Sequence, residues 1–152
     1  MKTTSRRFRI STLVTASVFV LIAGCSSQGG HHGMGGDMNH GMRLNLSGAS
    51  EVPAVTTRAS GMGMIRVGAD RSVSGKIMVS GLDGTMAHIH QGAPGQNGPV
   101  VIGLTGMGNE WMVPPGSKLT EAQYDAYKAG NLYVNVHTDA NKGGEIRAQL
   151  RP

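Results

Sequence analysis

Apolar and polar residues alternate with a period of two along most of the chain beyond residue 42. Turn-forming residues interrupt this alternation about every 8–12 positions, a pattern typical of β-sandwiches and barrels. We therefore predict an all-β domain whose strands pack as two sheets over one core. The predicted strands cover residues 43–47, 60–68, 73–80, 85–90, 100–105, 132–138 and 145–150.

A single segment departs from the β pattern and predicts a short helix over residues 121–129. Thr120 and Gln123 have the spacing of a capping box, and Tyr124 and Tyr127 fall on one helical face. Gly130 follows as a C-terminal stop. The expected fold class is thus an all-β β-sandwich of about seven strands with one short helix.

The second and third predicted strands form a hairpin in which Met62 lies opposite Met78, and Met64 opposite Lys76. These side chains lie on the face that points away from the core. Methionines on an otherwise polar face lead us to expect that another strand or the helix covers them. A surface that binds soft metal ions is the alternative.

The N-terminus has the composition of an export signal. Basic residues lie within positions 2–9, an uncharged apolar run follows over 10–22, and the segment closes with Leu-Ile-Ala-Gly-Cys. This ending resembles the lipobox of bacterial lipoproteins, which implies that residues 1–24 are a lipoprotein signal peptide and that Cys25 carries lipid (palmitate). An ordinary signal peptide is the alternative. Ser26 after Cys25 indicates an outer-membrane anchor, facing the periplasm or the cell surface.

Removal of this signal changes the charge balance of the chain. The sequence contains 14 Lys and Arg against 9 Asp and Glu, and four of the basic residues lie in the signal. The exported protein is therefore nearly neutral, and we expect no nucleic-acid partner. Cys25 is the only cysteine, so the domain has no disulfide.

Residues 25–42 are rich in glycine and lack branched aliphatic side chains, which predicts a flexible tether between the lipid and a domain over residues 43–152. Imidazoles together with thioethers favour copper, because thioethers prefer Cu(I) and imidazoles bind Cu(II). A spacer with incidental histidines and methionines is the alternative. The candidate ligands in the tether are His31, His32, Met34, Met38, His40 and Met42.

A second candidate metal site combines His88 and His90, which share one face of a strand, with His137 on a neighbouring strand. The competing interpretation is structural: each ring binds the backbone of the loops at residues 92–99 or 139–144. Ligands about 2 Å from one ion require ring nitrogens roughly 3–4 Å apart, which separates the two interpretations.

Other chemistry has little support in the sequence. Glu145 and Arg147 alternate on the last predicted strand, where we expect them to pair with each other or to orient a histidine. No serine lies in a nucleophile motif, and Cys25 is assigned to lipid. A binding protein is therefore favoured over an enzyme.

Four segments together resemble the successive blocks of the CHRD domain, the module named after chordin. They read LSGASEVPAVTTRASGMG (46–63), AHIHQGAPGQNGPVV (87–101), LTEAQYDAYKAGNLYVNVHT (119–138) and GGEIRAQL (143–150). The chain has EVPAV where EVPPV is usual and IRAQL where IRGQL is common. The resemblance implies a Greek-key-like β-sandwich. It implies no settled catalytic activity, and in chordin the domain belongs to an extracellular protein that binds growth factors.

Three hypotheses for function follow. The first is an envelope lipoprotein that binds copper for storage, buffering or tolerance. The second is a metal-free module that holds a protein or glycan partner outside the cytoplasm. The third is a small copper enzyme similar to superoxide dismutase, which also combines a sandwich with a His-x-His strand.

Overall fold

The computed structural model describes residues 41–152, which form nine strands and one α-helix. A turn of 3-10 helix, η1 (Gly48–Ser50), follows the first strand, and the helix α1 spans Glu121–Lys128. The strands are β1 (Met42–Ser47), β2 (Ser60–Val67), β3 (Val73–Ser80), β4 (Met86–Gln91), β5 (Val100–Gly103), β6 (Thr105–Met107), β7 (Glu110–Met112), β8 (Leu132–His137) and β9 (Ile146–Leu150).

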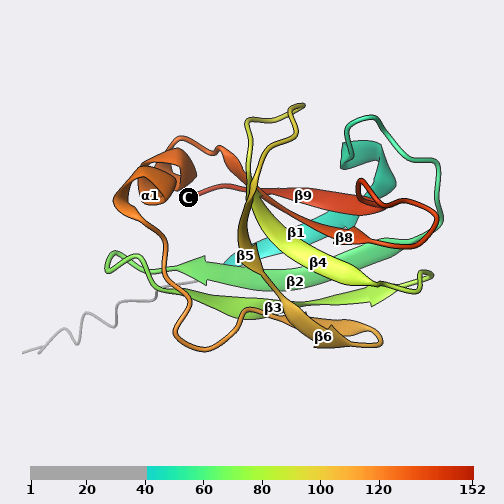
Figure 1. The fold of residues 1–152 in the computed structure, drawn as a ribbon, viewed down its shortest axis with the longest axis horizontal. Helices are drawn as coiled ribbons and strands as arrows, with labels where there is room; N and C mark the ends of the chain where they lie inside the picture. The colour runs from blue at the N-terminus through green and yellow to red at the C-terminus, as the bar shows by residue number, and fades with distance from the viewer. Residues whose placement is uncertain (1–40) are drawn as a thin grey trace, which may run out of the picture. The chain divides into compact units, whose positions relative to one another are not determined.

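The nine strands form one antiparallel sheet in the order β5-β4-β8-β9-β1-β2-β3-β7-β6. β5 and β6 stand at the two edges of this sheet, yet only Leu104 separates them in the chain. The sheet therefore folds round into two layers, and the chain changes layer where β5 leads into β6 (Figure 1). Bent strands that change layer are a usual corner of such packings. Leu104 remains tied to the layer that contains β4, β5 and β8 (the first layer), because its N–H donates to the Ala87 carbonyl at 2.9 Å.

The predicted β-sandwich with one helix is confirmed, and the strand count is the main difference. The expected strand over residues 100–105 is divided at Leu104, and β7 was not predicted. β6 and β7 form a hairpin with a two-residue turn, in which Gly108 has a φ of 67°. Strands of three residues are too short for an alternating pattern to reveal them.

The core lies between the two layers and consists of aliphatic side chains. Leu132, Val134 and Val136 of β8 are completely buried, as is Ile77 of β3. At the end of the domain next to the C-terminus, Tyr124 and Tyr127 of α1 pack against this core (Figure 1). The expected capping box is present, since Thr120 Oγ1 accepts from the Gln123 N–H and Gln123 Oε1 accepts from the Thr120 N–H.

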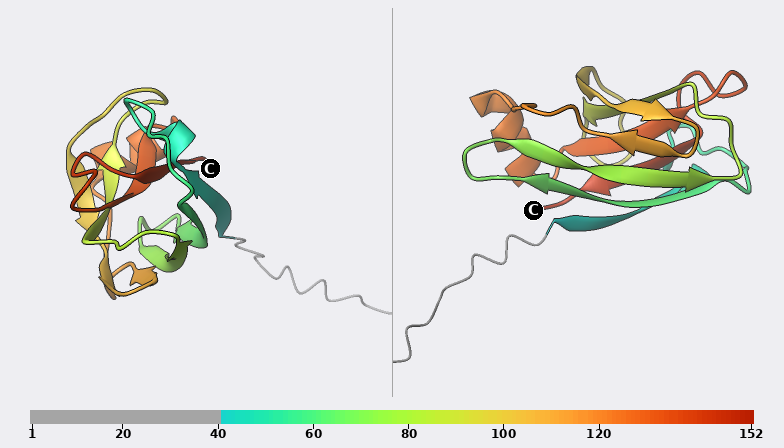
Figure 2. Two further views of the ribbon diagram at one scale, coloured as in Figure 1. Left: turned by 90° about the vertical axis from the view of Figure 1, so that its right-hand side faces the viewer. Right: turned by 90° about the horizontal axis from the view of Figure 1, so that it is seen from below.

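The predicted register of β2 and β3 is correct, but the expected cover over its outer face is wrong. Met62 pairs with Met78 and Met64 with Lys76. Met62 is 67% exposed, and Met64, Met78 and Met112 of β7 are also exposed. The helix lies at the end of the domain, away from this methionine face (Figures 1 and 2).

Close packing of β2 against β3 depends on Gly63. A Cβ at this position would overlap the Lys76 carbonyl oxygen and lie 2.7 Å from Ile77 Cα. We expect Gly63→Ala to lower the free energy of unfolding by about 2–3 kcal/mol, because backbone cannot move aside as a side chain can. Urea denaturation measures the difference.

Gly143→Ala is the matched control, because a Cβ there meets nothing within 4 Å. It should change the free energy of unfolding by no more than about 0.5 kcal/mol. Equal effects of the two substitutions would contradict the packing of β2 on β3 described above.

Candidate metal centre

His88 and His90 lie on the outer face of the first layer because β4 alternates. Ala87 and Ile89 point into the core, which leaves the two imidazoles on the opposite face. β8 lies beside β4, in a regular register that runs from Met86 opposite His137 to Gln91 opposite Leu132. The pairing of β4 with β8 thus brings His137 to the same face.

The structure brings these three histidines together. His88 Nδ1 lies 3.0 Å from His137 Nε2, and one nitrogen from each of the three rings falls within 4.8 Å of the others. The ring centroids of His88 and His90 are 5.4 Å apart. The closest pair has the separation expected of two ligands of one ion, and the third ring lies farther away.

Two of the rings are also held by loop backbone, as the structural interpretation predicts. His90 Nδ1 lies 3.0 Å from the Gly98 carbonyl oxygen, and His137 Nδ1 lies 2.9 Å from that of Lys142. A carbonyl only accepts, so both Nδ1 atoms carry hydrogen and donate. The Nε2 atom of each neutral ring therefore keeps its lone pair. Histidine ligands of metals usually donate their second nitrogen in this way, so the structural and metal-binding roles are compatible.

The position of the hydrogen on His137 also determines the position of the hydrogen on His88. Because His137 Nε2 has no hydrogen in the neutral ring, His88 Nδ1 donates to it. His90 Nε2 is buried and has no partner among the described residues. The Nε2 lone pairs of His90 and His137 are already available, and the lone pair of His88 moves from Nε2 to Nδ1 when its hydrogen moves the other way. The candidate ligand atoms are His88 Nδ1, His90 Nε2 and His137 Nε2.

The environment of His88 and His90 favours the uncharged form of both rings. Burial lowers the pKa of His88, and the neighbouring His137 and His90 lower it further. Burial also lowers the pKa of His90, although its hydrogen bond to Gly98 acts in the opposite direction. A histidine must be neutral to bind a metal ion, so these shifts favour ligation at ordinary pH.

His90 is held by a stack of side chains that continues through Tyr133 to Arg147. The His90 ring lies parallel to that of Tyr133, with centroids 4.9 Å apart and an angle of 4° between them. The guanidinium carbon of Arg147 lies 3.4 Å from the Tyr133 ring centroid. Arg147 Nη2 donates to the Gln96 carbonyl at 2.9 Å, so the stack fixes the loop that contains Gly98.

The expectation that Glu145 and Arg147 pair with each other is wrong, whereas Arg147 does help to hold the surroundings of a histidine through Tyr133 and the loop that binds His90. Glu145 accepts hydrogen bonds from Thr57 and Thr138, both at 2.7 Å. Arg147 is engaged by the ring and loop just described. The residue pattern carried no sign of the cation–π contact, because it depends on the pairing of β8 with β9.

Glu51 is a buried carboxyl group in the same region. Burial raises its pKa to about 7, and the nearby charge of Arg147 offsets part of this effect. A Cβ on Gly144 would collide with Glu51 Oε1 and Asn135 Nδ2, so only glycine leaves room for these groups. Glu51 was not among the residues that the sequence indicated.

The predicted tether site lies almost wholly outside the described residues, as do Cys25 and the signal peptide. This applies to His31, His32, Met34, Met38 and His40. Met42 belongs instead to β1, where it packs against the core and its sulfur accepts from the Arg151 N–H at 3.0 Å. Met42 therefore has a structural role in β1, unlike the role predicted for it as a ligand in the tether.

Comparison with known families shows that the sequence model of the CHRD domain matches residues 42–150. No curated protein and no solved structure matches the chain. Within residues 41–152, no helix is long and apolar enough to cross a membrane.

The raised pKa of Glu51 predicts a pH dependence of stability. Below the unfolded-state pKa near 4.5, Glu51 holds its proton in both states and its effect on stability is most favourable. As pH rises, the unfolded chain ionises first, and the free energy of unfolding falls until the folded-state pKa near 7 has been passed. The expected loss is about 3 kcal/mol between pH 4 and pH 8.

The isosteric Glu51→Gln variant isolates this effect, because it leaves every other titrating group in place. Urea denaturation at several pH values gives the free energy of unfolding of both proteins. Between pH 4 and pH 8 it should fall by about 3 kcal/mol more in the wild type than in the variant. Parallel stability profiles for the two proteins would show that Glu51 is not the source.

Proposed function

The chain belongs to the CHRD-domain family, and on the geometry of its histidines we propose that it binds copper at the cell envelope. The proposed role is copper storage, buffering or tolerance. The proposal rests mainly on one observation: His88, His90 and His137 converge while backbone carbonyls hold the far nitrogens of two of them. This is the arrangement that a metal-binding imidazole requires.

The distances between the ring nitrogens allow the three histidines to bind a single ion with little movement of their side chains. Nitrogens bound at about 2 Å to one ion lie roughly 3–4 Å apart, and the pair at 3.0 Å is already near that range. The widest pair, at no more than 4.8 Å, needs to close by about 1 Å. Rotation of the His88 ring, which is only half-buried and has no hydrogen bond to a loop, supplies this movement.

Three imidazoles suit copper and zinc alike, so the choice of copper draws on the tether. Its histidines and methionines, His31 to His40, precede β1, which starts at Met42. Thioethers favour Cu(I) and bind Zn(II) weakly. The tether would capture the ion, and the histidines of the domain would hold it.

Attachment to the envelope is the second part of the proposal. Cys25 ends a segment that resembles a lipobox, and residues 26–41 separate it from β1. A lipid at Cys25 would keep the copper site close to the outer membrane.

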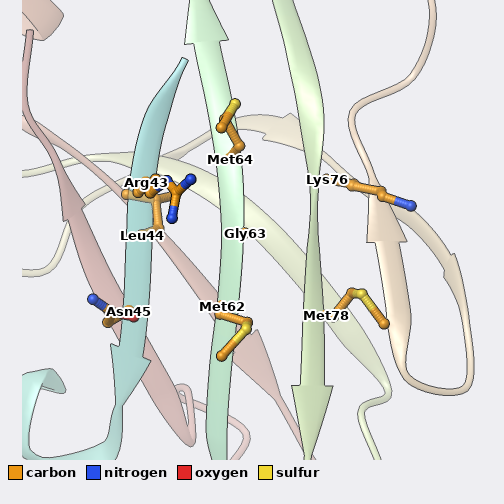
Figure 3. A pocket seen from close by; sticks show the side chains of 8 residues that line it. All are labelled: Arg43, Leu44, Asn45, Met62, Gly63, Met64, Lys76 and Met78. Atoms are coloured by element: carbon orange, nitrogen blue, oxygen red, sulfur yellow. The ribbon is translucent and has the colours of Figure 1, made fainter. Parts of the chain in front are cut away.

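A metal-free interaction module is the second candidate, and the methionine face favours it. Arg43, Met62, Met64 and Met78 line a groove of about 470 Å³ on the outer side of β1, β2 and β3, between side chains that point to solvent (Figure 3). Exposed methionines adapt to many partner shapes, which suits the capture of a protein.

Copper titration tests the main proposal. The chain without residues 1–25 should bind Cu(I) and Cu(II) more tightly than about 1 µM in competition with a chromophoric chelator. His88→Gln should remove one equivalent of copper, because it deletes a ligand from the half-buried ring and leaves the loop contacts of the other rings intact. Circular dichroism and a melting curve verify that the variant is folded.

A tether-substituted variant provides the matched control. It carries alanine at His31, His32 and His40, and leucine at Met34 and Met38. Retention of one equivalent in this variant assigns that ion to the domain. If neither protein binds copper tighter than micromolar, the metal function fails and the interaction module is favoured.

Cys25→Ala tests the anchor. The wild type should take up radiolabelled palmitate and sediment with the outer membrane, whereas the variant should lose both properties because it lacks the acylated thiol. Unchanged labelling and sedimentation of the variant would contradict lipidation at Cys25.

A further inference from the structure

We propose that Met86 is the fourth ligand of the copper centre, and that its thioether makes the centre preferentially a Cu(I) site. This inference rests on the proposed copper function and adds a ligand and an oxidation state to it. In the sequence Met86 alternates with His88 and His90, so the three side chains share one face of β4.

The strand register places Met86 beside the histidines. Met86 is directly opposite His137 in the pairing of β4 with β8. Cβ atoms of such cross-strand partners lie about 4.5–5.5 Å apart. The irregularity between Ile89 and His90 affects only the pairing of β4 with β5, so it leaves this face of β4 and β8 in register.

Met86 is free to turn toward an ion. It is 48% exposed, and it does not belong to the core cluster. On the β5 side, Gly103 lies opposite His88 and offers no side chain, while the Leu104 side chain points into the core. A methionine sulfur lies two bonds beyond Cβ on a flexible side chain, so it can reach an ion held between the rings of His88 and His137.

The chemistry of the donor set favours the monovalent ion. Within the described residues, the clustered metal-binding groups are three imidazoles without a carboxylate. A neutral set of ligands in a partly buried site compensates a single positive charge better than a double one. A thioether adds a soft donor that stabilises Cu(I) in particular. The other exposed methionines, Met62, Met64, Met78 and Met112, lie on β2, β3 and β7 and have no histidine as strand partner.

Met86→Leu tests the proposal in the full-length, tether-substituted chain, purified in mild detergent, where only the domain site remains. The substitution should weaken Cu(I) binding on the order of tenfold and leave the affinity for Cu(II) nearly unchanged, because only the soft donor is lost. The reduction potential should therefore fall by about 59 mV for each tenfold loss. X-ray absorption of the Cu(I) form should detect one sulfur neighbour that is absent from the variant.

Met112→Leu is the matched control. Met112 is 49% exposed, almost the same as Met86, but it lies on β7 opposite Lys76. Its substitution should change neither the Cu(I) affinity nor the absorption spectrum. A sulfur signal that persists in Met86→Leu would overturn the proposal, since another methionine would then be the ligand.

Failure of this inference differs from failure of the proposed function. A wild-type site with nitrogen and oxygen neighbours only, and equal Cu(I) affinities with and without Met86, overturns the role of Met86 while the three-histidine site stands. A wild-type site that binds no copper overturns both.

Discussion

The stack of His90, Tyr133 and Arg147 is the interaction on which the rest of the site depends. The polar side chains of β8 would otherwise lie on an exposed sheet face, yet Tyr133, Asn135 and His137 are all buried. The loop that contains Gln96 and Gly98 folds back over Tyr133, and Arg147 and His90 hold its carbonyl groups. Asn135 and His137 bind the second loop through the Gly143 and Lys142 carbonyl groups. A charged group that stacks on an aromatic ring and donates to backbone carbonyls is well compensated for burial.

The hydrogen bonds of both loops also determine the chemistry of the histidines. Because the Gly98 and Lys142 carbonyls take the Nδ1 hydrogens, the Nε2 lone pairs of His90 and His137 remain available. The same hydrogen bonds that stabilise the loops therefore prepare the rings for an ion. A structural role for the histidines does not argue against a metal site in this fold, since the two roles use different nitrogens.

The sequence predicted those features that depend on local pattern. Period-two alternation found the long strands, the spacing of Thr120 and Gln123 found the helix start, and the register of Met62 with Met78 followed from one short loop. The contacts of two histidines with their loops were also expected.

Features that depend on long-range packing could not be found this way. The short strand β7 and the change of layer between β5 and β6 carry almost no periodic signal. The exposure of the methionine face depends on where α1 docks, and the position of Arg147 over Tyr133 depends on the pairing of β8 with β9. Glu51 acquires its raised pKa only through tertiary burial.

The most direct test of the account is nitrogen-15 NMR of the imidazole rings during titration with Cu(I), which is diamagnetic. We expect His88 Nδ1, His90 Nε2 and His137 Nε2 to shift together at one equivalent, while the Nδ1 atoms of His90 and His137 remain protonated. Shifts at those two Nδ1 atoms, or unchanged spectra for all three rings, would contradict a copper centre built on these histidines.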